Sequence, residues 1–154
     1  MKFSDLLSSK AVKVLSSASS KKRLMHDIAD VAEAAYGIPA QRAVEALMER
    51  ESLGPTGVGH GVALPHARLD SVDRVVGIFI LLEKPIDFDA VDRQPVDVIF
   101  ALFAPESSGA EHLKALALVS RTLRDTAFCA KLRANHDAAT LHTIITEAAR
   151  IQAA

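Results

Sequence analysis

The sequence of 154 residues lacks what several common classes of protein are built from. It has a single cysteine, Cys129, so no internal disulfide forms and a reducing compartment is indicated. Its formal net charge is only −1, which provides no basic surface to hold the phosphates of a nucleic acid. We therefore expect no nucleic-acid partner.

Long hydrophobic runs are also absent. The longest, VVGIFILL at residues 75–82, is too short to cross a bilayer, and the N-terminal MKFSDLLSSK lacks the apolar core of a secretory signal. Hydrophobic residues make up 49% of the chain and charged residues 24%, the balance of a compact globular protein. We expect a cytoplasmic protein without membrane insertion, in which residues 1–154 form a single domain.

The hydrophobic pattern changes its period along the chain. Two short runs rich in β-branched and aromatic residues, 75–82 and 95–105, are predicted as central strands buried on both faces. Segments with helical spacing flank them on both sides. These segments are 20–37, which Gly37 ends, 39–52, the stretch after Pro105, 128–132 and 141–148. The predicted fold is α/β: a three-layer sandwich in which a small mixed β-sheet carries helices on both faces.

Two local features are predicted less directly. Residues 83–95, between the strands, are polar and interrupted by proline, so we expect a connection with at most an edge strand. The helix after Pro105 is expected to begin at Ser108, with Glu111 completing a capping box. Its apolar stripe is expected at Leu113, Leu116, Ala117 and Leu123.

The segment least typical of plain scaffold is GPTGVGHGVALPHARLD, residues 54–70. It has neither the Gly-Lys-Ser/Thr of a nucleotide-binding loop nor the Gly-x-Gly-x-x-Gly of a dinucleotide site. The backbone N–H groups of closely spaced glycines can nevertheless line an anion-sized hollow. The glycines concerned are Gly54, Gly57, Gly59 and Gly61. His66 ends the run Val62–Pro65, which is predicted as a short strand, and Pro65 restricts the backbone that presents it.

Two further candidates lie at the ends of predicted elements. His112 falls near the first turn of its helix, where unpaired N–H groups favour anions, and Arg50 ends the helix before the glycine-rich loop. An arginine there either complements the helix dipole or holds a phosphoryl group, and His112 is either an exposed first-turn residue or a ligand-binding one. His60, His66 and His112 also supply three imidazoles, but no HExxH helix or cysteine pair accompanies them, so no metal is expected. The remaining histidines, His26, His136 and His142, are expected at the surface.

At these residues the chain resembles a known family. RESLGPTGVGHGVALPHARLD, IDFDAVDRQPVDVIFALFAP and EHLKALALVSRTL resemble successive blocks of the enzyme IIA domains of the bacterial phosphoenolpyruvate-dependent phosphotransferase system, fructose/mannitol class. The likeness covers nearly the whole chain, with a domain core at about residues 5–148, and is closest to the nitrogen-regulatory branch. His60 and Ala67 depart from that pattern, since many relatives have asparagine and glycine there.

The resemblance implies a function for the candidate residues. His66 would be the phosphorylated histidine, a tele-phosphohistidine intermediate, with Arg50, His112, Gly59, His60 and Gly61 stabilising the phosphoryl group. A small histidine phosphocarrier protein would be the donor, no cofactor would be needed, and ion-transport or kinase proteins would be regulated. In this interpretation the phosphotransferase step has a mainly regulatory role. Two alternatives stay open: a sugar-specific IIA component that serves a separate IIB domain, and a binding module whose histidine is never modified.

Overall fold

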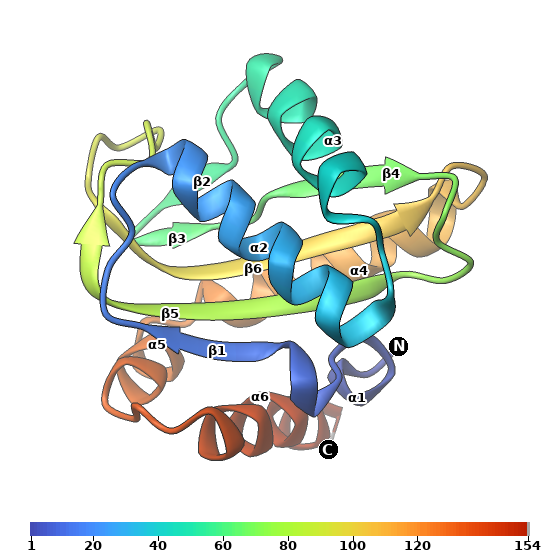
Figure 1. The fold of residues 1–154 in the computed structure, drawn as a ribbon. Helices are drawn as coiled ribbons and strands as arrows, with labels where there is room; N and C mark the ends of the chain where they lie inside the picture. Colours follow the sequence, from blue (N-terminus) through green and yellow to red (C-terminus); the bar gives the residue numbers. More distant parts are fainter. Residues whose placement is uncertain (154) are drawn as a thin grey trace.

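The computed structural model describes residues 1–153, and their side chains as far as residue 148. Its centre is a six-stranded mixed sheet with the order β1-β5-β6-β3-β2, in which β4 also pairs with β6 (Figure 1). The strands are β1 (Val12–Leu15), β2 (Gly57–Gly59), β3 (Val62–Ala63), β4 (His66–Leu69), β5 (Val76–Ile86) and β6 (Val96–Pro105). The helices are α1 (Phe3–Leu6), α2 (Lys21–Tyr36), α3 (Ala40–Ser52), α4 (Gly109–Leu123), α5 (Thr126–Arg133) and α6 (Ala138–Ala153), with a short 3₁₀ turn η1 (Ser9–Ala11).

The helices cover both faces of the sheet. Figure 1 shows α2 and α3 over one face and α4, α5 and α6 on the opposite side. The predicted three-layer α/β sandwich with a mixed sheet is therefore confirmed. Among the described residues, no helix is both long enough and apolar enough to span a bilayer.

The core is centred on β5 and β6, as their composition predicts. The two strands run antiparallel, with Phe79 opposite Phe100, and both rings are almost completely buried. Removing a side chain of this size from water contributes about 1.5–3 kcal/mol. Strands β1, β3 and β4 then pair in parallel with this central pair, and β3 and β4 both use β6 as their partner.

Local sequence signals explain the ends of the first long helices. The Ser20 hydroxyl caps α2 by accepting from the Arg23 N–H at 3.0 Å, and Gly37 ends it in the left-handed conformation, with φ of 72°. Pro39, the first residue of the predicted helical segment 39–52, lies one residue before α3. The side of α3 that faces the core is formed by Ala43 and Leu47.

Three expectations about the second half of the fold are wrong in detail. Strand β5 continues through Lys84 and Pro85 to Ile86, which pairs with Val96. The register is irregular between Leu81 and Ile86, and a strand tolerates proline at such an irregularity. The Ser108 hydroxyl turns back to the Pro105 carbonyl, so the capping box with Glu111 does not form.

The apolar stripe of α4 is also rotated from the expected one. Leu113 is 65% exposed, and Ala117 is exposed as well, whereas the buried face includes Ala115, Val119 and His112. A polar side chain replaces leucine in the first buried turn. A pattern of apolar residues alone therefore predicts the wrong buried face for α4.

Gly77 marks the closest approach within the sheet. A Cβ there would lie 2.6 Å and 3.0 Å from two carbons of the Phe100 ring. We expect Gly77→Ala to lower the free energy of unfolding by about 1–3 kcal/mol, since the extra methyl group overpacks a buried ring. Urea denaturation measures it. Gly109→Ala is the control, because open space surrounds that position and the first turn of α4 accepts alanine. Equal stability of Gly77→Ala and wild type would contradict the packing argument.

Candidate functional site

His66 lies inside the sheet and not at the end of the predicted strand. Strand β3 stops at Ala63, and a second strand, β4, begins at His66, opposite Leu102 of β6. The break falls at Pro65, which has no N–H to give to a ladder, while its carbonyl accepts from the Leu102 N–H at 3.0 Å. The backbone that carries the His66 ring is thus held in place by Pro65 before it and by the pairing of β4 with β6.

The hydrogen bonds of the His66 ring define its tautomer. Its Nδ1 lies 2.9 Å from the Leu64 carbonyl, which can only accept, so Nδ1 carries the proton. On the other side, Arg50 Nε donates to His66 Nε2 at 3.3 Å, and a second nitrogen of Arg50 donates to the Gly54 carbonyl at 3.0 Å. A guanidinium cannot accept a proton, so Nε2 presents its lone pair. Both contacts select the same neutral imidazole.

Burial favours this neutral form as well. Desolvation lowers the pKa of His66 below its ordinary value; the Leu64 bond acts in the opposite direction, and the positive charge of Arg50 lowers the pKa further. His66 is therefore a neutral imidazole near pH 7.

His112 approaches His66 from the first turns of α4. The two ring centroids are 5.4 Å apart at an interplanar angle of 71°, and His112 is only 5% exposed, which rules out the expected alternative of a surface residue. Arg68 Nε donates to His112 Nδ1 at 3.4 Å, so the proton of the neutral ring is on Nε2. Within the described part of the chain, that buried Nε2 has no hydrogen-bond partner. A buried donor without an acceptor is costly, so His112 Nε2 is a candidate for a functional contact.

Protonation of His112 is disfavoured more strongly than protonation of His66. Burial, then the neighbouring His66 and Arg68, lower its pKa to about 4. Near neutral pH its Nε2–H is therefore an uncharged hydrogen-bond donor.

An open cavity of about 500 Å³ connects these groups. Its lining comes from α3, β4 and α4 and comprises Ala46, Glu49, Arg50, Leu53, His66, Ala67, Arg68 and His112. Three residues distant in the sequence, Arg50, His66 and His112, are therefore brought together as predicted. Leu53 is 81% exposed beside them and forms an apolar edge where a protein partner can make contact.

Arg68 is the residue of this cavity that the sequence reasoning missed. It lies two residues after His66 in β4, so both side chains point to the same face of the sheet. If a strand had been predicted to begin at His66, its two-residue period would have placed the Arg68 cation on the same face as the histidine.

The glycine-loop residues have different neighbours. Gly59, His60 and Gly61 form the turn between β2 and β3, all with positive φ. The His60 N–H donates to Asp92, the His60 carbonyl accepts from Arg133, and a Cβ on Gly61 would lie 2.6 Å from that guanidinium. Of the three, Gly59 and His60 line a separate hollow of about 290 Å³. Their contribution to holding a phosphoryl group stays a prediction.

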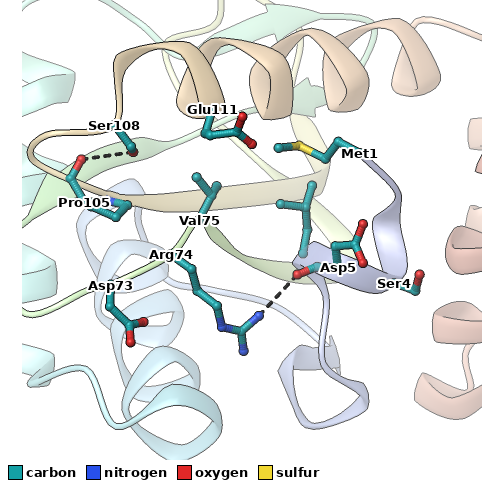
Figure 2. A pocket seen from close by; sticks show the side chains of 10 residues that line it. Met1, Ser4, Asp5, Asp73, Arg74, Val75, Pro105, Ser108 and Glu111 are labelled. Carbon is teal, nitrogen blue, oxygen red and sulfur yellow. Dashed lines mark hydrogen bonds between the residues drawn. The ribbon is translucent and has the colours of Figure 1, made fainter.

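A further cavity of about 580 Å³ lies beyond the start of α4. Figure 2 shows its lining, in which Arg74 donates to the Asp5 carbonyl at 3.2 Å and Ser108 and Glu111 come from the turn before His112. It includes none of the residues predicted for the site.

The other histidines are placed by simple contacts. His26 and His136 are exposed, as expected, but His142 is half-buried, and its Nε2 lies 3.0 Å from the Leu7 carbonyl. Across the residues that the structure describes, no cluster of three or more histidine, cysteine, aspartate or glutamate side chains is arranged to hold a metal ion. The three imidazoles considered from the sequence do not form such a group.

The fold and this histidine pair define a class of protein. Residues 5–148 match the family model for the phosphoenolpyruvate-dependent sugar phosphotransferase system, EIIA 2, and the chain belongs to this family. The resemblance stated from the sequence is confirmed.

Individual relatives point to the nitrogen-regulatory branch. A nitrogen regulatory protein of Bradyrhizobium diazoefficiens is 41% identical over 145 residues, which cover 94% of this chain and 95% of the relative. The crystal structure of nitrogen regulatory protein IIA-Ntr from Neisseria meningitidis matches with a TM-score of 0.84 at 34% identity, covering 92% of this chain and 97% of that one.

A more distant structure shares the fold alone. In a complex from Escherichia coli, the mannitol enzyme IIA is bound to phosphorylated mannitol enzyme IIB. The match has a TM-score of 0.66 at 16% identity and covers 80% of this chain and 86% of that one.

The depressed pKa of His112 predicts a pH-dependent stability. Because the unfolded chain binds this proton near pH 6.5 and the folded chain only near pH 4, the contribution is complete above pH 6.5 and is lost as the pH falls toward 4. We expect wild type to lose about 2 kcal/mol more unfolding free energy than His112→Gln between pH 7 and 4.5. Urea denaturation at both pH values measures this. Parallel losses in the two proteins would contradict a buried neutral His112.

Proposed function

We propose that this chain is a histidine phosphoryl carrier that accepts a phosphoryl group on Nε2 of His66 from a small histidine phosphocarrier protein. The observation that carries the proposal is the arrangement around that atom. Its lone pair faces the cavity and, among the described residues, accepts only the Arg50 N–H, at 3.3 Å, while the opposite nitrogen is held by the Leu64 carbonyl. Nitrogen-regulatory relatives and the phosphotransferase family support the same chemistry.

The transfer needs no proton shuttle. The Nε2 lone pair attacks phosphorus in line, the N–P bond of the donor phosphohistidine breaks, and its electron pair returns to the donor imidazole. The positive character that His66 acquires is stabilised at Nδ1–H by the Leu64 carbonyl. Since donor and acceptor are both imidazoles, the reaction is readily reversible.

The peripheral oxygens of the phosphoryl group need positive partners. Arg50 must turn its guanidinium from the nitrogen toward these oxygens, and His112 supplies its unpartnered Nε2–H. Arg68 adds a second positive charge to the cavity wall. Such preorganised donors stabilise charge in the transition state more than water does.

A second candidate function follows from one neighbour. The mannitol enzyme IIA is bound to a phosphorylated IIB partner, and the exposed edge at Leu53 would suit a similar docking here. In that case the phosphoryl group would pass to a separate IIB domain. The identity to nitrogen regulatory proteins over most of the chain favours the regulatory function, in the cytoplasm.

Replacing the two histidines in turn should give a graded loss. His66→Ala should abolish phosphoryl acceptance because the bond-forming nitrogen is gone, whereas His112→Ala should slow transfer by about 10²- to 10³-fold. The measurement is intact mass against time with phosphoenolpyruvate, enzyme I and a panel of phosphocarrier proteins.

His136→Ala is the matched control, since that histidine is exposed and should leave the rate unchanged. An acid-labile phosphate on His66→Ala would reject the assignment of His66. If wild type accepts no phosphoryl group from any carrier in the panel, the carrier function itself is wrong.

Regulation would follow from the charge that the phosphoryl group adds. With the charge of a phosphoserine taken as a guide, the phosphoryl group brings about −1.5 to −2 near pH 7, which is large beside a net charge of −1. A partner covering the cavity would bury that charge, so regulated ion-transport or kinase proteins should prefer the unphosphorylated form. We expect His66→Asp, a partial charge mimic, to retain fewer partners from lysate than His66→Ala. Equal recovery of each captured protein by both variants would contradict charge-dependent docking.

A further inference from the structure

A buried ion pair lies directly behind the reactive cavity, at the residue after Arg50. The Glu51 side chain is only 5% exposed, and its Oε1 lies 2.7 Å from Lys21 Nζ. The same oxygen accepts from the Thr56 N–H at 3.0 Å, while Oε2 accepts from the Thr56 hydroxyl. Taking a carboxylate out of water is expensive, so these partners are needed simply to keep it there.

Thr56 connects this carboxylate to the ring of His66. Thr56 is 3% exposed, and its carbonyl accepts from the Leu64 N–H at 2.9 Å. The carbonyl of the same Leu64 holds His66 Nδ1. A single path of hydrogen bonds therefore runs from Glu51 through the Thr56 backbone to the nitrogen that sets the tautomer.

A second path leads to the arginine. The loop closed by Glu51 and Thr56 contains Gly54, whose carbonyl accepts from Arg50 at 3.0 Å. Anchoring the far end of this loop at Thr56 fixes where that carbonyl lies. Arg50 and His66 thus depend on the same hydrogen bonds between Glu51 and Thr56, which we call the clamp.

Lys21 ties the clamp to another helix. It is the first residue of α2, and its Nζ lies 4.7 Å from the centroid of the buried Phe88 ring and 3.7 Å from Asp89. The ammonium is therefore held in place as well as paired. The position of Glu51 is set by packed elements and not by the flexible loop that it restrains.

We propose that Glu51 and Thr56 are positioning residues for phosphoryl transfer, which hold the Leu64 carbonyl and the Arg50 guanidinium in register with His66. This assignment rests on the proposed carrier function. Neither residue lines the cavity, so their effect is exerted through Leu64 and Gly54. Loss of the clamp should lower kcat more than it raises the KM for the donor protein, because neither residue is available at the cavity to touch that protein.

Three variants separate the clamp from simple packing. Thr56→Val keeps the shape of the side chain and removes the hydroxyl, whereas Thr56→Ser keeps the hydroxyl and removes a methyl group. We expect Thr56→Val and Glu51→Gln to lower kcat about 10- to 100-fold, the range for small misplacements of reacting groups. The kcat of Thr56→Ser should stay within about threefold of wild type. The hydroxyl bond that it keeps contributes more than the methyl group that it loses.

Glu45→Gln is the matched control, because it removes the same charge from an exposed position of the same helix. Circular dichroism of each variant checks folding. Should Glu51→Gln unfold because Lys21 loses its partner, the Thr56 pair still decides the question. Equal losses in Thr56→Ser and Thr56→Val, or a rise in KM without a fall in kcat, would overturn the proposal.

A measurement that needs no phosphoryl donor distinguishes the carrier function from the positioning function of Glu51 and Thr56. Nitrogen-15 shifts of the His66 ring report the Nδ1–H tautomer directly. We expect wild type, Glu45→Gln and Thr56→Ser to show that tautomer alone, and Thr56→Val and Glu51→Gln to show a mixture of the two. Failure of wild type to accept phosphate would reject the carrier function, whereas an unmixed tautomer in Thr56→Val would reject the positioning function.

Discussion

The hydrogen bond from His66 Nδ1 to the Leu64 carbonyl decides which nitrogen can react, and much of the fold is arranged to keep it. A peptide carbonyl accepts and never donates, so the ring cannot exchange its tautomer without losing the bond. Leu64 is fixed through Thr56 on one side, and Pro65 through β6 on the other. The reactive nitrogen is therefore directed toward the cavity by backbone geometry.

The same surroundings explain how the proposed phosphoryl site remains stable before a dianionic group arrives. Two imidazoles kept neutral by burial carry no charge to repel one another, although their centroids are only 5.4 Å apart. The permanent positive charges belong to Arg50 and Arg68. A guanidinium is more weakly hydrated than an ammonium group, so removing its water costs less free energy. One buried donor, His112 Nε2–H, is left without a partner among the described residues, a cost that the proposed phosphoryl group would remove.

Much of the fold could be predicted because its strongest signals are local. Periodicity located the central strands and long helices, and a proline–histidine pair at the end of an apolar run located His66. What failed depended on contacts between distant segments. The stripe of α4 was misplaced because its first buried residue is His112, whose burial depends on β4. The strand containing His66 was misassigned because β4 exists only through pairing with β6. Arg68 was missed because His66 was assigned to the end of a strand and not to the start of β4.

The parallel pairing of β4 with β6 has a consequence for when this site first exists. His66 gains its orientation only after a strand far later in the chain has docked beside it, and His112 arrives with the helix after that strand. Non-local parallel pairing is slow to form because a long loop must close first. A nascent or partly unfolded chain therefore has histidines but no reactive centre. Chemistry at His66 would then report that a molecule has completed its folding, so incompletely folded copies would remain outside the phosphate relay.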